Sequence, residues 1–125
     1  MLVVHHPSDL TYAALPGGRL EWGENVKTCI KREIIEELGV EPQIGRLLFI
    51  NTFFDGSNTQ SMEFFFEILN GKDYADTNRP IGTHAHELAK ISWISPETNV
   101  NLLPKALGDA FKKGELLADV PRYIN

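Results

Sequence analysis

Residues 18–40 read GRLEWGENVKTCIKREIIEELGV, and the interpretation of the whole chain starts from this stretch. Its second half has the apolar spacing of an amphipathic helix that follows Asn25, a favourable N-cap residue. Gly39 is a typical helix stop, and Pro42 follows it closely. The apolar stripe consists of Val26, Cys29, Ile30, Ile34 and Leu38. We therefore expect one amphipathic helix between Asn25 and Gly39.

Three glutamates of this helix share one face. At about 100° per residue, Glu33 and Glu37 lie about 40° apart, and Glu36 lies about 60° to the other side of Glu33. This face overlaps the apolar stripe, so the acids lie at the edge of the packed surface. Crowded, partly desolvated carboxylates repel one another unless a cation or several donors compensate. Because oxygen-only ligation selects hard divalent ions, the cluster predicts a Mg²⁺ or Mn²⁺ site.

Arg32 precedes Glu36 by one helical turn. It could hold that acid in place or contact a phosphate. For the acids taken alone, the alternative is a solvated helix face with ion pairs to Lys27, Lys31 and Arg32.

The segments around this helix alternate between strand and turn signals. We expect strands at residues 2–4, 12–15 and 19–22, a pair of antiparallel strands at residues 44–54 and 61–69, and a further strand at residues 91–94. Residues 70–83 are polar and punctuated by Gly and Pro, which predicts a loop. Pro104 is expected to open a last helix that runs to about Lys113.

The bulk composition is that of one ordinary globular domain covering residues 1–125, because 42% of the residues are hydrophobic and 23% are charged. The formal charge of -5 argues against binding to a nucleic-acid backbone. We find no apolar stretch of bilayer length and no secretory signal, and the single cysteine, Cys29, excludes an intramolecular disulfide. These features predict a cytoplasmic protein without a membrane partner.

The pattern of residues 18–40 resembles the box of the Nudix hydrolases, G-x5-E-x7-R-E-U-x-E-E-x-G-U, in which U is aliphatic. Every specified position is filled, by Gly18, Glu24, Arg32, Glu33, Ile34, Glu36, Glu37, Gly39 and Val40. The resemblance implies the α/β class and a Nudix-type α/β/α sandwich with a mixed central sheet. Family members usually have a strand before the one expected at residues 2–4. Either the start of this chain is truncated or its sheet lacks an edge, so we expect a homodimer that covers this region.

The resemblance also implies a reaction and roles for individual residues. Water would attack a phosphorus of a small nucleotide or diphosphate substrate, with Mg²⁺ or Mn²⁺ as cofactor. Glu33, Glu36 and Glu37 would be the metal ligands, and the carbonyl of Gly17 would complete the coordination. Glu24 would support the metal through water or through Arg32. The general base would be Glu33 or Glu87, which precedes the strand at residues 91–94. Glu87 could equally be a further metal ligand.

Three functional classes share this scaffold. The first is a hydrolase, which the complete set of box acids favours. The second is a catalytically silent nucleotide-binding module, which would be expected to lack one or more of these acids. The third is an isopentenyl-diphosphate isomerase, but Cys29 lies inside the box helix, where it would not serve such a reaction.

Overall fold

The computed structural model describes residues 1–54, 56–77 and 88–124 of the 125-residue chain. In these residues, six strands form two three-stranded sheets, accompanied by two α-helices and one short 3₁₀ helix. The expected α/β class is therefore confirmed. Strands that we expected in one mixed sheet are divided between an antiparallel sheet and a mixed one.

The first sheet is built around β1 (Leu2–His6), which pairs antiparallel with β2 (Asp9–Ala14) and β5 (Lys90–Trp93). Successive strand residues point to opposite faces. Val3 accordingly belongs to one core cluster and Val4 to the other, and both side chains are buried. Both faces of this sheet are thus covered.

The second sheet has the order β4-β3-β6. Strands β3 (Ile44–Phe54) and β4 (Gln60–Ile68) form the expected antiparallel pair. The short strand β6 (Arg122–Ile124) runs parallel to β3 and was not predicted. The guanidinium of Arg122 lies 4.0 Å from the ring centroid of Phe49 and donates to the carbonyls of Glu115 and Leu116. A tertiary contact therefore places this three-residue strand, which is too short for a periodicity signal.

The helix expected after Asn25 is α1 (Val26–Leu38). The side chain of Asn25 accepts a hydrogen bond from the backbone N–H of Thr28 over 2.9 Å. Gly39 adopts the left-handed conformation at φ 77° and donates to the carbonyl of Ile35, which ends the helix. The last helix, α2 (Lys105–Lys112), follows Pro104 as expected.

Two local predictions are wrong. Residues 19–22 form no strand, because the segment reaches a turn at Trp22 and Gly23 without pairing to another strand in the described part of the chain. The segment expected to be a loop throughout contains a 3₁₀ helix, η1 (Gly71–Tyr74). Tyr74 at its end is buried, and its hydroxyl donates to the carbonyl of Val40 over 2.9 Å. Residues 78–83 of the expected loop lie outside the described residues.

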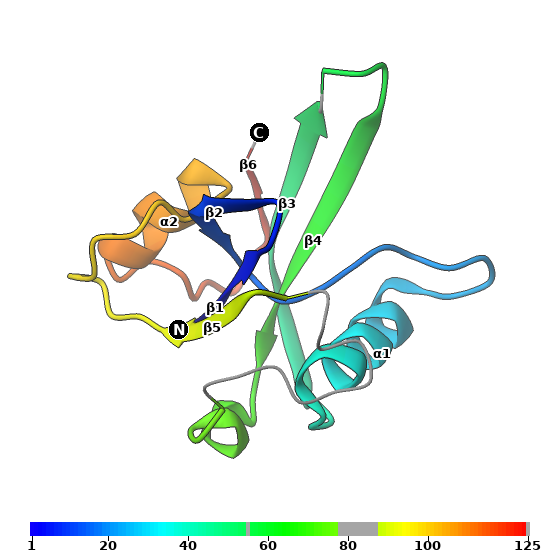
Figure 1. Cartoon of the computed structure of the whole chain (residues 1–125). Coiled ribbons are helices and arrows are strands. Elements are labelled where there is room, and N and C mark those ends of the chain that lie inside the picture. The colour runs from blue at the N-terminus through cyan, green and yellow to red at the C-terminus, as the bar shows by residue number, and fades with distance from the viewer. Residues whose placement is uncertain (55, 78–87, 125) are drawn as a thin grey trace.

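The two helices lie on opposite sides of the strands (Figure 1). On one side, Ile34 and Leu38 of α1 pack with Val4 and Ile91. On the other side, Leu107 of α2 packs with Val3 and with residues of β3. This layering holds α1 against the antiparallel sheet, and the tip of the β3–β4 hairpin points away from α1 (Figure 1).

Replacing Leu107 with Ala tests the α2 side of this core. Leu107 is 1% exposed, so Leu107→Ala should lower the free energy of unfolding by about 2–5 kcal/mol through lost burial and the cavity left behind. The matched control is Leu117→Ala, because Leu117 is 59% exposed and its removal should change stability by less than about 0.5 kcal/mol. Urea unfolding followed by circular dichroism measures both. Equal losses in the two variants would contradict the placement of α2.

Candidate functional site

The segment before α1 runs against the acidic face of that helix at Gly18. A Cβ atom built on Gly18 would lie 2.1 Å from Cδ of Glu33 and 2.4 Å from each of its carboxylate oxygens. Any side chain at this position would therefore displace the Glu33 carboxylate. The absence of a side chain at Gly18 lets the backbone form a cradle for this acid.

Arg32 lies at the centre of the acidic cluster. Its Nε donates to Oε2 of Glu24 over 2.7 Å and its Nη2 donates to Oε1 of Glu24 over 2.9 Å, which is a bidentate pair. Its Nη1 donates to Oε1 of Glu33 over 2.9 Å and to Oε2 of Glu36 over 3.1 Å. One guanidinium thus holds three carboxylates, and the planar fork of donors in arginine suits this arrangement.

Two further contacts tie Arg32 and Glu24 to the preceding loop. Nη2 of Arg32 also donates to the backbone carbonyl of Arg19 over 3.0 Å. The backbone N–H of Glu21 donates to Oε1 of Glu24 over 2.7 Å. Because the loop and the helix share this network, the position of the loop depends on the ionic contacts of Arg32.

The electrostatics of the cluster follow from these contacts. The hydrogen bonds from Arg32, assisted by the one from the backbone of Glu21, lower the pKa of Glu24 from 4.5 to about 2. The same bond to Glu24, with further help from Glu33, raises the pKa of Arg32 above its already high ordinary value. Glu24 is therefore ionised throughout the physiological range, and Arg32 is always charged.

The structure brings together four of the residues that the sequence singled out: Glu24, Arg32, Glu33 and Glu36. Glu37, on the same helix, is only 3% exposed. Gly17 directly precedes the Gly18 cradle. Glu87 lies outside the described residues, so its position relative to the cluster stays a prediction.

The donor chemistry of the cluster fits a hard divalent cation. Carboxylates of Glu33, Glu36 and Glu37 offer only oxygen, which Mg²⁺ and Mn²⁺ prefer, and Gly18 has no side chain that would displace the Glu33 carboxylate. In the described ranges, no group of three or more carboxylate, imidazole or thiolate side chains is set close enough to hold a metal ion. In this arrangement the positive charge of Arg32 offsets the charge of three of the acids.

Sequence reasoning left two parts of this arrangement undecided. It placed Arg32 beside Glu36 and gave Glu24 a role through water or through Arg32, and the structure shows a bidentate pair between Arg32 and Glu24, eight residues earlier and outside the helix. It assigned no role to Gly18 beyond filling the pattern. The signal was the fixed spacing of glycine, glutamate and arginine, but spacing alone does not show which side chains meet across a loop.

Cys29 does not serve as a reactive thiol. It is 5% exposed, and burial raises the pKa of its thiol, with a further contribution from the charge of Glu24. A buried, protonated thiol on the packed face of α1 agrees with the expectation that Cys29 would not support isomerase chemistry.

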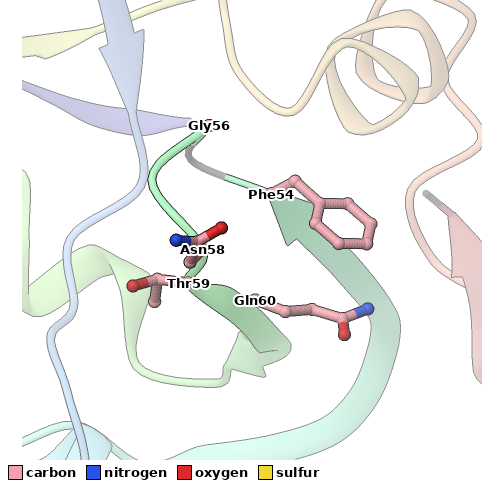
Figure 2. A pocket seen from close by; sticks show the side chains of 5 residues that line it. All are labelled: Phe54, Gly56, Asn58, Thr59 and Gln60. Carbon is pink, nitrogen blue, oxygen red and sulfur yellow. The ribbon is translucent and has the colours of Figure 1, made fainter.

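A hollow in the described structure lies elsewhere, at the tip of the β3–β4 hairpin (Figure 2). Its lining consists of Phe54, Gly56, Asn58, Thr59 and Gln60, and it contains no ionisable side chain. It therefore does not coincide with the acidic cluster.

In the described part of the chain, no helix has the length and apolar character needed to span a membrane.

The low pKa of Glu24 predicts how stability depends on pH. A carboxylate whose pKa is lower in the folded state stabilises the fold above its unfolded pKa, and this contribution is lost as the pH falls from about 4.5 to about 2. The wild type should therefore lose more stability than Glu24→Gln between pH 6 and pH 3, as measured by urea unfolding at each pH. Glu21→Gln is the control, because the exposed Glu21 carboxylate is 3.7 Å from Arg32. This variant should have the same dependence of stability on pH as the wild type. A Glu24→Gln profile parallel to that of the wild type would contradict this role.

Comparison with known proteins agrees with this geometry. The family model described as the NUDIX domain matches residues 1–119. The E. coli ORF135 protein has a similar structure, with a TM-score of 0.66 and 24% sequence identity over 90% of this chain and 79% of that chain. A UDP-X diphosphatase is similar at a TM-score of 0.65 and 22% identity, over 99% of this chain and 60% of that chain.

A third similar structure is an ADP-ribose pyrophosphatase from Streptococcus suis, with a TM-score of 0.61 and 16% identity over 98% of this chain and 88% of that chain. At these identities the structures share the fold, which confirms the Nudix-type architecture expected from the sequence. The family model covers nearly the whole chain and includes the complete set of box residues. The chain therefore belongs to the Nudix family, and it is a Nudix hydrolase.

Proposed function

We propose that this enzyme hydrolyses a diphosphate linkage in a nucleotide or a related nucleoside-diphosphate metabolite, with Mg²⁺ or Mn²⁺ as cofactor. The observation that supports it best is the acidic cluster on α1, in which Glu24, Glu33 and Glu36 converge on one guanidinium. Such a concentration of carboxylates beside a fixed arginine suits a site that receives cations together with phosphate.

In this proposal Glu33, Glu36 and Glu37 hold the cation, and the carbonyl of Gly17 contributes a further oxygen. The cation, when bound, neutralises charge on the phosphates and acidifies the attacking water. Gly18 keeps the Glu33 carboxylate at the loop, and Glu24 acts through Arg32 because both of its oxygens accept from that guanidinium. Glu24 is thus a positioning residue.

Arg32 has two tasks in the proposed reaction. Before substrate binds, it offsets the mutual repulsion of three carboxylates and so keeps the site folded. Its bidentate pair with Glu24 fixes the plane of the guanidinium, and Nη1 bridges Glu33 and Glu36. Nη1 would be the donor nearest to a phosphate if Glu33 and Glu36 held a cation, because Nε and Nη2 would stay bonded to Glu24.

A carboxylate must accept the proton of the attacking water, and two residues are candidates for this base. Glu33 lies within the described cluster, where one of its oxygens accepts from Arg32. Glu87 is the other candidate. The pH profiles of kcat for Glu33→Gln and Glu87→Gln identify the base, because only its replacement removes the acidic limb of the profile.

Similar structures narrow the substrate class. One is named a UDP-X diphosphatase and another an ADP-ribose pyrophosphatase, and both names describe cleavage of a diphosphate attached to a nucleoside. A catalytically silent binding module is the second candidate function. The retention of all box acids, including the buried Glu37, favours hydrolysis over this alternative.

The proposal is tested by a panel of nucleoside triphosphates, nucleotide sugars, ADP-ribose and dinucleoside polyphosphates. Each is incubated with the protein and Mg²⁺ or Mn²⁺, and the release of phosphate, pyrophosphate or mononucleotide is measured. We expect at least one substrate to turn over, and we expect excess chelator to abolish its turnover. Tight nucleotide binding without turnover of any substrate would contradict the proposed hydrolase function and support a catalytically silent binding module.

Neutralising single acids tests the metal-ligand assignment. Glu36→Gln and Glu37→Gln should each lower kcat by about a hundredfold or more and leave the fold intact, because glutamine keeps the shape but not the charge of the ligand. The control is Glu41→Gln, just beyond α1, where a 64% exposed side chain pairs with Lys31. Turnover in the control should stay near that of the wild type. Near-normal kcat in both ligand variants would refute the assignment.

We also propose that the protein is cytoplasmic, acts on a substrate other than nucleic acid and forms a homodimer. Sedimentation velocity at micromolar concentration distinguishes the homodimer from a monomer.

A further inference from the structure

Asn51 on β3 carries a buried carbonyl oxygen that lacks a partner in the described structure. The residue is 3% exposed, and its Oδ1 accepts no hydrogen bond from residues 1–54, 56–77 or 88–124. Its Nδ2 donates to Oε2 of Glu63 on β4 over 2.8 Å. Most buried polar groups in proteins are hydrogen-bonded, so an acceptor left in this state calls for a donor.

The orientation of this amide is fixed by its neighbour. Because Nδ2 of Asn51 donates to Oε2 of Glu63, Oδ1 on the other arm of the amide faces away from Glu63. Glu63 therefore positions Asn51 with its acceptor directed away from the pair.

The pair lies on the core-facing side of the β3–β4 hairpin, at the border between core and solvent. Cross-strand register places Phe49 opposite Phe65, Asn51 opposite Glu63, and Phe53 opposite Ser61, so one face of the hairpin carries all six residues. Phe49 is 2% exposed, whereas Phe53 is 48% exposed. Asn51 thus lies between Phe49 and Phe53 along this face, and its buried acceptor is near the point where the face begins to open.

This face adjoins the segment that leads to the acidic cluster. Phe49 belongs to the core cluster against which Leu15 packs. Leu15 precedes Gly18 by three residues, so their Cα atoms are at most about 11 Å apart. Gly18 in turn contacts the Glu33 carboxylate. The core end of the hairpin face, at Phe49, and the proposed hydrolytic site are therefore linked by one short segment of chain.

We infer that Asn51, oriented by Glu63, recognises an exocyclic amino group on the nucleobase of the substrate. A nucleobase is planar with apolar faces and a hydrogen-bonding edge, which suits an acceptor flanked by phenylalanine rings. An amino group supplies the N–H donor that Oδ1 lacks, whereas a carbonyl at the same position would oppose one acceptor to another. The inference deepens the proposed function and rests on it, since it specifies which nucleotides the hydrolase prefers.

The test compares nucleotides that differ at this one group. The values of kcat/KM are measured with Mg²⁺ for ATP against ITP and for CTP against UTP, because the first member of each pair has an amino group where the second has a carbonyl. The wild type should prefer the amino member of at least one pair by about tenfold or more, as expected when a buried acceptor is satisfied by one ligand only. In Asn51→Leu this preference should fall to about threefold or less.

Two further variants separate recognition from folding. Asn51→Leu combined with Glu63→Leu removes both polar groups together and avoids leaving Glu63 without its partner. Asn51→Asp combined with Glu63→Gln restores the bond in reverse and keeps an acceptor directed outward, so it should retain the preference for the amino member. Thr52→Val is the control, since Thr52 is on the same strand but on the opposite face, and it should behave as the wild type.

Nuclear magnetic resonance gives a readout that does not depend on turnover. In ¹⁵N-labelled protein, the side-chain amide signal of Asn51 is assigned by its absence from Asn51→Leu. Addition of AMP or CMP without metal should shift this signal, and addition of IMP or UMP should shift it less. An Asn51 signal that no nucleotide moves would mean that an internal water satisfies Oδ1, and this result would overturn the inference.

Failure of the inference and failure of the proposed function give different results. If nucleotides are hydrolysed but neither pair is distinguished, or if the preference persists in Asn51→Leu, the inference is wrong and the hydrolase proposal stands. If no nucleotide and no other diphosphate compound is hydrolysed under any metal condition, both are wrong.

Discussion

The ionic contacts of Arg32 are the constraint on which the site depends. Glu24, Glu33 and Glu36 lie close enough to repel one another, and a single guanidinium joins all three. Because Glu24 belongs to the loop and the other acids to α1, the same contacts hold the loop against the helix. The bond from Arg32 to the Arg19 carbonyl extends this attachment to the start of the loop. The same ionic contacts therefore offset the charge of the acids and fix the geometry of the loop.

The fold supplies the rigid support for this cluster. The central strand β1 directs Val4 toward α1 and Val3 toward α2, so the helix that carries the acids packs on a sheet that is itself covered from behind. Tyr74 packs beside Ile34 and donates its hydroxyl proton to the Val40 carbonyl just past the helix. Burial raises the pKa of Tyr74 to about 12, so this donor stays protonated at any physiological pH. The end of α1 near Val40 is thus fixed by a group that does not titrate at physiological pH.

The hairpin adds a second polar element of a different kind. The acidic cluster is charged and faces the loop, whereas the Asn51–Glu63 pair lies between phenylalanine rings at the edge of the core. A site for a nucleotide needs both environments, because phosphates require charge compensation and a base requires an apolar slot with a few directed hydrogen bonds. The segment from Leu15 to Gly18 leads from the core cluster that contains Phe49 to the acidic cluster.

The sequence alone determined the elements whose signals are local. Asn25 and Gly39 bound α1 because capping depends on neighbouring backbone groups, and the pattern of residues 18–40 identified the acids because side chains one turn apart must share a helix face. Residues 19–22 were mistaken for a strand because alternation also occurs in a loop held by ionic contacts. Only the tertiary structure decided that Arg32 pairs with Glu24, that β6 joins the mixed sheet and that the Asn51 oxygen is directed away from Glu63. These features join residues distant in the chain, and their free energy comes from contacts that no local pattern encodes.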